Sequence, residues 1–145
     1  MRSDILNFKD VQITNVVFNL NKNFQENSDE EQGYEFKIEP NFLSNRHDKT
    51  DGLVLVKTTF FDKEFEKNNK PFYLELEVMG HFSSEPSGKP FTDFATNSLN
   101  IVVPYIRSYV TTFTSLAGLK PVIFPPINIY ELIGESLKVD TEQEQ

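Results

Sequence analysis

The chain has 145 residues, of which 22 are acidic and 14 basic, and its formal net charge is −8 at pH 7. This charge repels phosphate backbones, and lysines and arginines form no cluster, so we do not expect the chain to bind nucleic acid. The absence of cysteine excludes disulfides, thiolate metal sites and a cysteine nucleophile. No apolar run is long enough to cross a bilayer, and the first residues lack the apolar core of a signal peptide. We therefore expect a cytoplasmic protein without membrane insertion.

The length is that of one ordinary domain. We expect residues 1–138 to form this domain and residues 139–145 to be an acidic tail without fixed structure. The composition has one unusual feature, fourteen phenylalanines and no tryptophan. Phenylalanine adds a large apolar contact area without a polar group that needs a partner. This predicts either a core rich in phenylalanine or an apolar groove lined by some of these rings.

The first half of the chain predicts β-strands separated by polar turns. Apolar residues alternate along Val11–Leu20, but the alternation changes phase near Asn15, which predicts a strand with a β-bulge. Residues 34–39 alternate strictly between apolar and charged side chains, as expected for a strand with one buried face. Pro40 follows directly and limits the pairing of this strand on one side, because proline has no N–H to donate.

Two further strands are predicted at Leu53–Phe61 and Phe72–Phe82, separated by a charged turn over residues 62–70. In the last strand, the alternation of apolar and polar residues predicts one buried face and one solvent-exposed face, which carries Glu75 and Glu77. The turns are too short and too polar to contain crossover helices. We therefore predict a four-stranded antiparallel β-sheet, arranged as a meander.

A long helix is predicted from about Asn100 to Ala117, because apolar residues recur there at intervals of three and four. The apolar residues form two adjacent rows, and Arg107 is the one charged residue between Asn100 and Lys120. A single sheet covers one such row, so we expect a second polypeptide against the helix. The residues that we expect at an interface between subunits are Val103, Ile106, Tyr109, Val110 and Phe113.

Candidate helix-start residues are Asn97, Ser98 and Asn100, all of which are favourable N-caps. If Asn100 caps the helix, Pro104 lies at the edge of the first turn, where its missing N–H matters little. If the helix begins earlier, Pro104 lies inside it and kinks it. Gly118 predicts the end of the helix, because glycine readily adopts the left-handed conformation of a C-cap.

The segment after the helix is predicted to be extended over residues 121–126, since the residue before each proline is pushed out of the helical region. Asn128 is then predicted to cap a short helix from about Ile129 to Leu137. Strands followed by helices are typical of an α+β domain in which the helices pack on one face of the sheet.

Two motifs in this half of the chain resemble those of the SecB family of export chaperones. Val103-Pro104-Tyr105-Ile106-Arg107 stands where the family has a Phe-Pro-Tyr-Ala-Arg run, and Pro125-Pro126-Ile127-Asn128-Ile129 stands where it has Ala-Pro-Val-Asn-Phe. The order of the preceding elements is compatible with the same family. The resemblance implies a SecB-like fold, a sheet followed by a long and a short helix, assembled into a homotetramer that is a dimer of dimers.

The resemblance also implies a function and its sites. SecB-like chaperones hold unfolded polypeptides, without ATP, in grooves between the sheet and the loop and helix that follow the long helix. The groove residues that we expect here are Phe36, Ile38, Phe60, Phe61, Phe124 and Ile127. The family docks the SecA translocation motor on acidic residues of the outer sheet face, for which we expect Glu75 and Glu77. Asn15 and Asn19 stand at first-strand positions that are acidic in the family, which sets this chain apart.

The sequence contains no catalytic motif. His47 and His81 have no metal-ligand spacing, no serine lies in a Gly-x-Ser-x-Gly motif, and no glycine-rich phosphate loop is present. We therefore expect no enzymatic activity, no metal and no cofactor.

These observations predict an ATP-independent holding chaperone that binds unfolded polypeptides, with a role in protein export. One alternative is a SecB-like interaction domain with a single dedicated partner, for example the chaperone of a toxin–antitoxin system. Another is small-molecule binding, which requires a deep apolar cavity.

Overall fold

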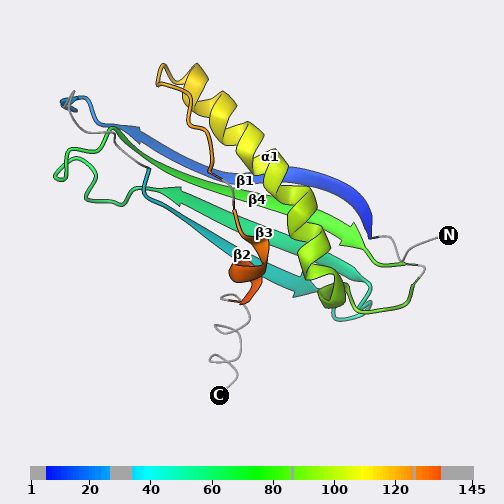
Figure 1. Ribbon diagram of the computed structural model, residues 1–145. Coiled ribbons are helices and arrows are strands. Elements are labelled where there is room, and N and C mark those ends of the chain that lie inside the picture. Colours follow the sequence, from blue (N-terminus) through cyan, green and yellow to red (C-terminus); the bar gives the residue numbers. More distant parts are fainter. Residues whose placement is uncertain (1–5, 27–33, 86, 126, 135–145) are drawn as a thin grey trace.

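The structure, a computed structural model, describes residues 6–26, 34–85, 87–125 and 127–134. Its strands are β1 (Asn7–Leu20), β2 (Phe36–Ser44), β3 (Asp51–Phe60) and β4 (Phe72–Ser83). A 3-10 helix, η1 (Phe91–Phe94), leads into the long helix α1 (Ala95–Leu116), and residues 129–134 are again helical. The predicted α+β fold is confirmed, because the helices lie on one face of the sheet (Figure 1).

The sheet is antiparallel, with the strand order β1-β4-β3-β2. β2, β3 and β4 follow one another as a meander, as predicted. β1 instead pairs with β4, from Asn7 opposite Ser83 to Leu20 opposite Phe72, and does not pair with β2. β1 and β2 are therefore the two edge strands of the described sheet. Pro40 lies in β2, where an edge position tolerates its missing N–H.

The predicted β-bulge in the first strand is confirmed. The register shifts between Ile13 and Asn15, and a second, unpredicted shift lies between Phe8 and Asp10. The extra residue of the first bulge is Thr14, whose hydroxyl donates to a carboxylate oxygen of Glu77 at 2.7 Å. Because of the bulge, Ile13 and Val16 lie on the same face of the strand although they are three positions apart. This explains the change of phase in the sequence.

Alternate residues of β4 separate an inner sheet face, covered by α1, from an outer face. The residues predicted to point inward are all buried: Phe72, Leu74, Leu76 and Val78. On the outer face, Glu75 and Glu77 are partly exposed, as predicted. Tyr73 differs from the prediction because it is only 7% exposed, and the ring of Phe65, from the loop between β3 and β4, packs against it at 6.1 Å.

The helical layer approaches the sheet most closely at two glycines. A Cβ atom at Gly80 of β4 would lie 2.8 Å from the side chain of Val102, and one at Gly52 of β3 would lie 2.1 Å from the ring of Phe91. Both distances are too short for a side chain to be accommodated without movement. The two glycines therefore set the spacing between the sheet and the η1–α1 segment.

The start of α1 differs from the prediction, since the helix begins at Ala95 and no N-cap lies at Asn97, Ser98 or Asn100. The preceding 3-10 turn supplies an acceptor for the N–H of Ala95, so the helix needs no side-chain cap there. Pro104 consequently lies inside the helix and removes one backbone hydrogen bond. The end is as predicted, because Gly118 has a φ of 86°.

The strip after α1 runs back along the helix and then towards β2 (Figure 1). It is fixed to α1 at Val122, whose N–H donates to the hydroxyl of Thr114 at 3.0 Å and whose carbonyl accepts from Thr111 at 2.7 Å. Asn128 caps the short helix as predicted, accepting from the N–H of Glu131 at 3.2 Å. The predicted end of this helix at Leu137 and the predicted acidic tail lie outside the described residues.

Candidate functional site

A groove with a volume of about 720 Å³ lies between the outer edge of β2 and residues 127–132. The residues that line it are Phe36, Lys37, Ile38, Glu39, Ile127, Asn128, Glu131 and Leu132. Since successive residues of a strand point to opposite faces, side chains from both faces of β2 contribute. The groove therefore follows the edge of the sheet and not one of its faces.

Three of the six residues predicted for a groove line this one, namely Phe36, Ile38 and Ile127. Phe60 and Phe124 lie beneath it and are almost fully buried, with their ring centroids 5.2 Å apart. The ring of Phe36 contacts both, at 5.8 and 5.4 Å. The apolar wall of the groove is therefore continuous with the core of the domain, which fixes its shape.

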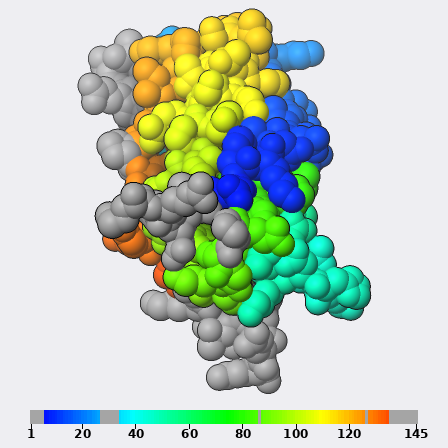
Figure 2. Space-filling view, turned by 90° about the vertical axis from the view of Figure 1, so that its right-hand side faces the viewer, coloured from blue at the N-terminus to red at the C-terminus, as the bar shows by residue number. Residues whose placement is uncertain are grey.

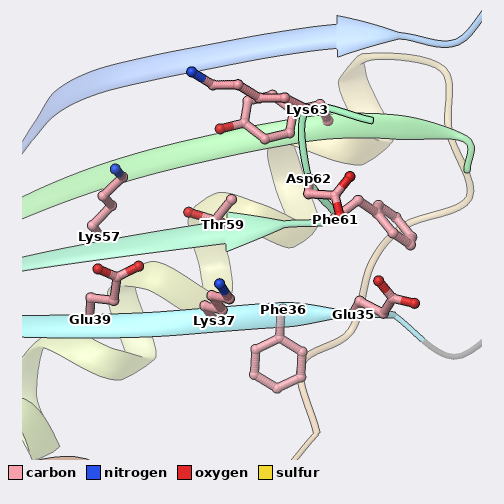
Figure 3. A pocket seen from close by; sticks show the side chains of 10 residues that line it. Glu35, Phe36, Lys37, Glu39, Lys57, Thr59, Phe61, Asp62 and Lys63 are labelled. Carbon is pink, nitrogen blue, oxygen red and sulfur yellow. The ribbon is translucent and has the colours of Figure 1, made fainter. Parts of the chain in front are cut away.

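The sixth predicted residue, Phe61, lies elsewhere. It follows β3 in the left-handed conformation, with a φ of 63°, and its ring packs edge-on against Phe72 at 5.3 Å. Phe61 lines a second pocket, of about 320 Å³, with side chains of the outer sheet face (Figure 3). The six predicted residues thus divide between the groove, the core below it and a second pocket, which shares Phe36, Lys37 and Glu39 with the groove.

Apolar and charged residues alternate along the part of β2 that lines the groove, so they point to opposite sides of the strand. The apolar side chains that line it are Phe36, Ile38, Ile127 and Leu132, and the charged ones are Lys37, Glu39 and Glu131. A peptide that lies along the groove in an extended conformation presents alternate side chains to these two sides. The groove therefore suits a segment in which apolar and polar residues alternate.

The main chain of β2 adds a second type of interaction. β2 pairs only with β3 among the described strands, so its other edge faces the groove. An exposed strand edge pairs with extended peptides through backbone hydrogen bonds, and pockets for alternate side chains supply selectivity. Pro40 has no N–H, so pairing along this edge lacks one donor at that position.

The structure places the predicted interface residues mainly against the sheet of the same chain. Val103, Ile106 and Val110 are buried within the single subunit, while Tyr109 and Phe113 are partly exposed. The apolar character of the first three is thus accounted for by the core. A second subunit is not needed to cover them.

An apolar surface that the sequence reading missed lies beside α1 on β1. Four apolar side chains of the inner face of β1 are exposed: Phe8, Ile13, Val16 and Leu20. Phe8 stacks on Tyr105 of α1 at 5.7 Å, and Figure 2 shows the blue atoms of β1 at the surface next to the helix. The sequence signal for this surface was the change of phase near Asn15, because the bulge there keeps the apolar residues before and after it on the same face of β1. We call this the β1–α1 surface.

The carboxylates predicted to dock a partner on the outer face already have partners within the sheet. Glu75 forms an ion pair with Lys57 at 2.7 Å, and this hydrogen bond raises the pKa of the Lys57 ammonium group. Glu77 accepts from the hydroxyl of Thr14. Asn15 and Asn19 face this side from β1, opposite Glu77 and Tyr73. The outer face therefore carries paired charges at the positions predicted for docking.

A hydrogen bond that spacing did not reveal joins His81 and Asp51 on the outer face. Nε2 of His81 lies 2.7 Å from Oδ1 of Asp51, and Lys9 of β1 lies 3.9 Å from the same oxygen. The hydrogen bond with His81 is the main cause that lowers the pKa of the Asp51 carboxyl group. The two residues are thirty positions apart in the sequence, so only the pairing of β3 with β4 brings them together.

Two other kinds of site are not found in the described part of the chain. No group of three or more histidine, aspartate or glutamate side chains there is placed to hold a metal ion. None of its helices combines the length and the apolar character that crossing a membrane requires.

Comparison with known proteins gives one clear sequence relative. No model of a known protein family matches the sequence. The chain is 30% identical to "Uncharacterized protein MJ0357" of Methanocaldococcus jannaschii over 145 residues, which covers 97% of this chain and 91% of that protein. Identity of this extent over nearly the whole of both chains indicates a common family.

The fold is similar to that of the Mycobacterium tuberculosis Rv1957 SecB-like chaperone, solved in complex with a ChAD peptide from the Rv1956 HigA1 antitoxin. The TM-score is 0.66 and the identity 15%, over 84% of this chain and 90% of that chain. A protein of unknown function from Streptococcus agalactiae is less similar, with a TM-score of 0.44 and 10% identity over 86% of this chain and 100% of the other. The chain therefore belongs to the family of the M. jannaschii protein MJ0357 and has the SecB-like fold that its sequence predicted.

Proposed function

We propose that this protein is an ATP-independent holding chaperone that binds extended segments of non-native polypeptides along the free edge of β2. The observation that carries the proposal is the groove itself, which combines an apolar wall with a strand edge that pairs with no other described strand. The SecB-like fold supports it, as does the antitoxin peptide bound by the Rv1957 chaperone.

In the proposed mode of binding, a client segment adds to β2 as a strand. Backbone hydrogen bonds provide affinity that is independent of the client sequence. Client side chains that face Ile38, Ile127 and Leu132 add about 1.5–3 kcal/mol each if they become fully buried, before the cost of ordering the client. Selection then favours chains that stay unfolded long enough to present such a segment, and release needs no nucleotide.

A second candidate function is an interaction domain with one dedicated partner. The complex of the Rv1957 chaperone with a peptide from an antitoxin favours this candidate, because one peptide of defined sequence is bound there. The groove described above serves either role. Pull-down from a lysate distinguishes them, since a holding chaperone retains many unfolded proteins and a dedicated domain retains one protein in a stoichiometric ratio.

We further propose that the protein self-associates through the β1–α1 surface, and not through the row of Val103, Ile106 and Val110. Exposed apolar side chains next to an edge strand form the kind of surface that a second subunit covers. A homotetramer, as the family resemblance implies, would have four times the 16.8 kDa of one chain. Mass measurement in solution tests this, and Ile13→Asp with Val16→Asp is expected to give the monomer mass.

Protein export through a SecA-type motor would use the outer face of the sheet. Glu75 and Glu77 would have to exchange their partners Lys57 and Thr14 for the motor. We therefore propose that client holding in the cytoplasm does not depend on this docking. Binding of purified SecA to the wild-type protein and to Glu75→Gln tests the docking separately.

The holding function is tested by light scattering of a reduced client that aggregates during refolding. The wild-type protein is expected to suppress scattering at a stoichiometric ratio, and Ile38→Asp and Ile127→Asp are expected to suppress it far less. Ile123→Asp is the matched control, because Ile123 lies in the same strip but is 72% exposed and outside the groove. Unchanged aggregation with the wild-type protein, or equal losses in all three variants, would contradict the proposal.

A further inference from the structure

Two hydrogen bonds at the ends of β2 show which of its backbone groups face β3. The N–H of Phe61 donates to the carbonyl of Glu35 at 2.8 Å, and the N–H of Asn45 donates to the carbonyl of Asp51 at 3.0 Å. Both pairs continue the register of β2 with β3, which runs without a shift. In an antiparallel ladder, opposite residues alternate between pairs that exchange hydrogen bonds and pairs that do not. The odd-numbered residues of β2 therefore bond to β3.

The even-numbered residues of β2 consequently direct their backbone groups to the outer edge of the sheet. These residues are Phe36, Ile38, Pro40, Phe42 and Ser44. The N–H and carbonyl groups of Phe36 and Ile38 have no hydrogen-bond partner among the described residues. Proline has no N–H, so Pro40 at an edge-facing position costs β2 no bond with β3. Its place in the alternation explains why this strand accommodates a proline.

The edge-facing donors of β2 coincide with the groove. From β2, the groove is lined by residues 36–39, so it ends before Pro40. Within this stretch Phe36 and Ile38 each offer an N–H and a carbonyl to the outer edge, whereas the backbone groups of the two charged residues are bonded to β3. The next edge-facing position after Ile38 is Pro40, which has no donor. A segment bound in the groove therefore finds two positions at which it can both donate and accept.

The side chains at these two positions determine which client residues fit opposite them. Phe36 lies on the inner face of the sheet, where its ring contacts Phe124 at 5.4 Å, and Ile38 lies two residues further on the same face. Opposite residues of an antiparallel pair point to the same face. Client side chains paired with Phe36 and Ile38 would thus point towards Ile127 and Leu132, which pack against the apolar core. The client residue between them would point to the outer face, where this part of β2 carries charged side chains.

We infer that the groove holds its client in one frame, as an antiparallel segment with apolar residues at positions i and i+2 that pair with Ile38 and Phe36. The residue between them is polar and points to the outer side. The frame rests on the proposed function, because it specifies the segment that the groove holds. Antiparallel pairing is the more stable kind, and every strand pair of the described sheet has it. Because both apolar residues donate through their N–H groups, proline is excluded at i and i+2 but accepted at i+1.

The test is a titration of the full chain with a blocked pentapeptide, Thr-Val-Thr-Val-Thr, in which NMR follows the methyl signals of Ile38 and Ile127. The two valines are the apolar residues of the frame, and a shift by one residue would place threonines there. Methylation of one amide nitrogen of the peptide removes one donor. Methylating the nitrogen of either valine is expected to weaken binding about tenfold. Methylating the nitrogen of the central threonine is the matched control and is expected to leave binding unchanged.

The pattern of losses decides whether the frame is correct. No loss at any nitrogen, equal losses at all three, or a loss at the central threonine alone overturns the frame, the last because it is the pattern of parallel pairing. In each of these cases the parent peptide has bound, so the holding function stands. Absence of saturable shifts with the parent peptide also overturns the frame. Light scattering with an aggregating client, measured on the same protein, then shows whether holding fails as well.

Pro40 allows a second test of the same frame. A heptapeptide with Thr-Val added at the N-terminus places its first valine opposite Pro40, where the carbonyl of that valine finds no donor. Pro40→Ala supplies the donor and is expected to tighten binding of the heptapeptide about fivefold, while binding of the pentapeptide stays unchanged. Asn41→Ala is the matched control, since the N–H of Asn41 faces β3. Equal affinity of the heptapeptide for Pro40→Ala and the wild-type protein overturns the frame, and thermal melting verifies that both variants fold.

Discussion

Two threonine hydroxyls hold the junction between α1 and the strip that leads to the groove, and that of Thr114 is fully buried. This hydroxyl donates to the carbonyl of Val110 at 2.8 Å and accepts from the N–H of Val122 at 3.0 Å. Both Thr114 and Val122 are 0% exposed. Thr114→Val preserves the shape of the side chain but leaves the N–H of Val122 buried without an acceptor.

A buried donor without a partner costs about 1–3 kcal/mol, so we expect Thr114→Val to lower the free energy of unfolding by that amount. The assay is urea denaturation followed by circular dichroism, with the change read from the midpoint. Thr112→Val is the control, since Thr112 is exposed on the same helix and has no hydrogen-bond partner in the described structure. The reasoning is refuted if the two variants unfold at the same urea concentration.

The same substitution connects stability to function. Among the described residues of the strip, Val122 is the last that forms a hydrogen bond with α1, and beyond it Phe124 and Ile127 are positioned by packing. If the strip loosens at Val122, the groove wall formed by Ile127 moves away from β2. Thr114→Val is therefore expected to weaken client holding under conditions in which the protein is still fully folded.

Three further predictions concern the core and the outer face. Gly80→Ala is expected to destabilise the fold by about 1–3 kcal/mol, because its Cβ would lie 2.8 Å from Val102 and would push α1 away from β4; thermal melting measures this loss. Thr58→Val is expected to raise the free energy of unfolding by about 1 kcal/mol, because the buried hydroxyl of Thr58 has no partner in the described structure; urea denaturation measures the gain. The pKa of Asp51 is lowered by folding, chiefly through His81, so its contribution to stability is present above its ordinary pKa of 3.8 and is lost as the pH falls through the lower pKa of the folded state. The stability difference between the wild-type protein and Asp51→Asn is therefore expected to shrink below about pH 4, as urea midpoints across that range will show.

Local signals in the sequence predicted the features that depend on neighbouring residues. The bulge near Asn15, the helix end at Gly118 and the cap at Asn128 were all found, because each depends on side chains a few positions apart. The start of α1 was not predicted, because a 3-10 turn precedes the helix in place of a capping side chain. A helix that continues directly from a 3-10 turn begins without a capping side chain, so its first residue cannot be recognised from the pattern of side chains.

Long-range pairing was the main limit of the sequence reading. Nothing in β1 indicates that its partner is β4, because this pairing is decided by how the whole sheet buries its inner face. The same limit affected the helix, where Val103 and Ile106 were assigned to an interface although both are buried within a single chain. The groove was partly predicted because Phe36 and Ile38 belong to an alternating pattern and Ile127 to a proline-rich strip, both of which are local.

The two sheet edges differ in a way that suits two different roles. β1 has no proline in its fourteen residues and carries exposed apolar side chains beside α1, so a second subunit can pair with it over a long stretch. β2 is shorter and contains Pro40, which removes a backbone donor and so opposes continuous pairing with another sheet. A single short peptide loses little from that missing donor, because it gains the side-chain contacts of the groove. In the proposed mode of binding, the proline would oppose sheet-to-sheet association at the β2 edge and leave that edge open to a client segment.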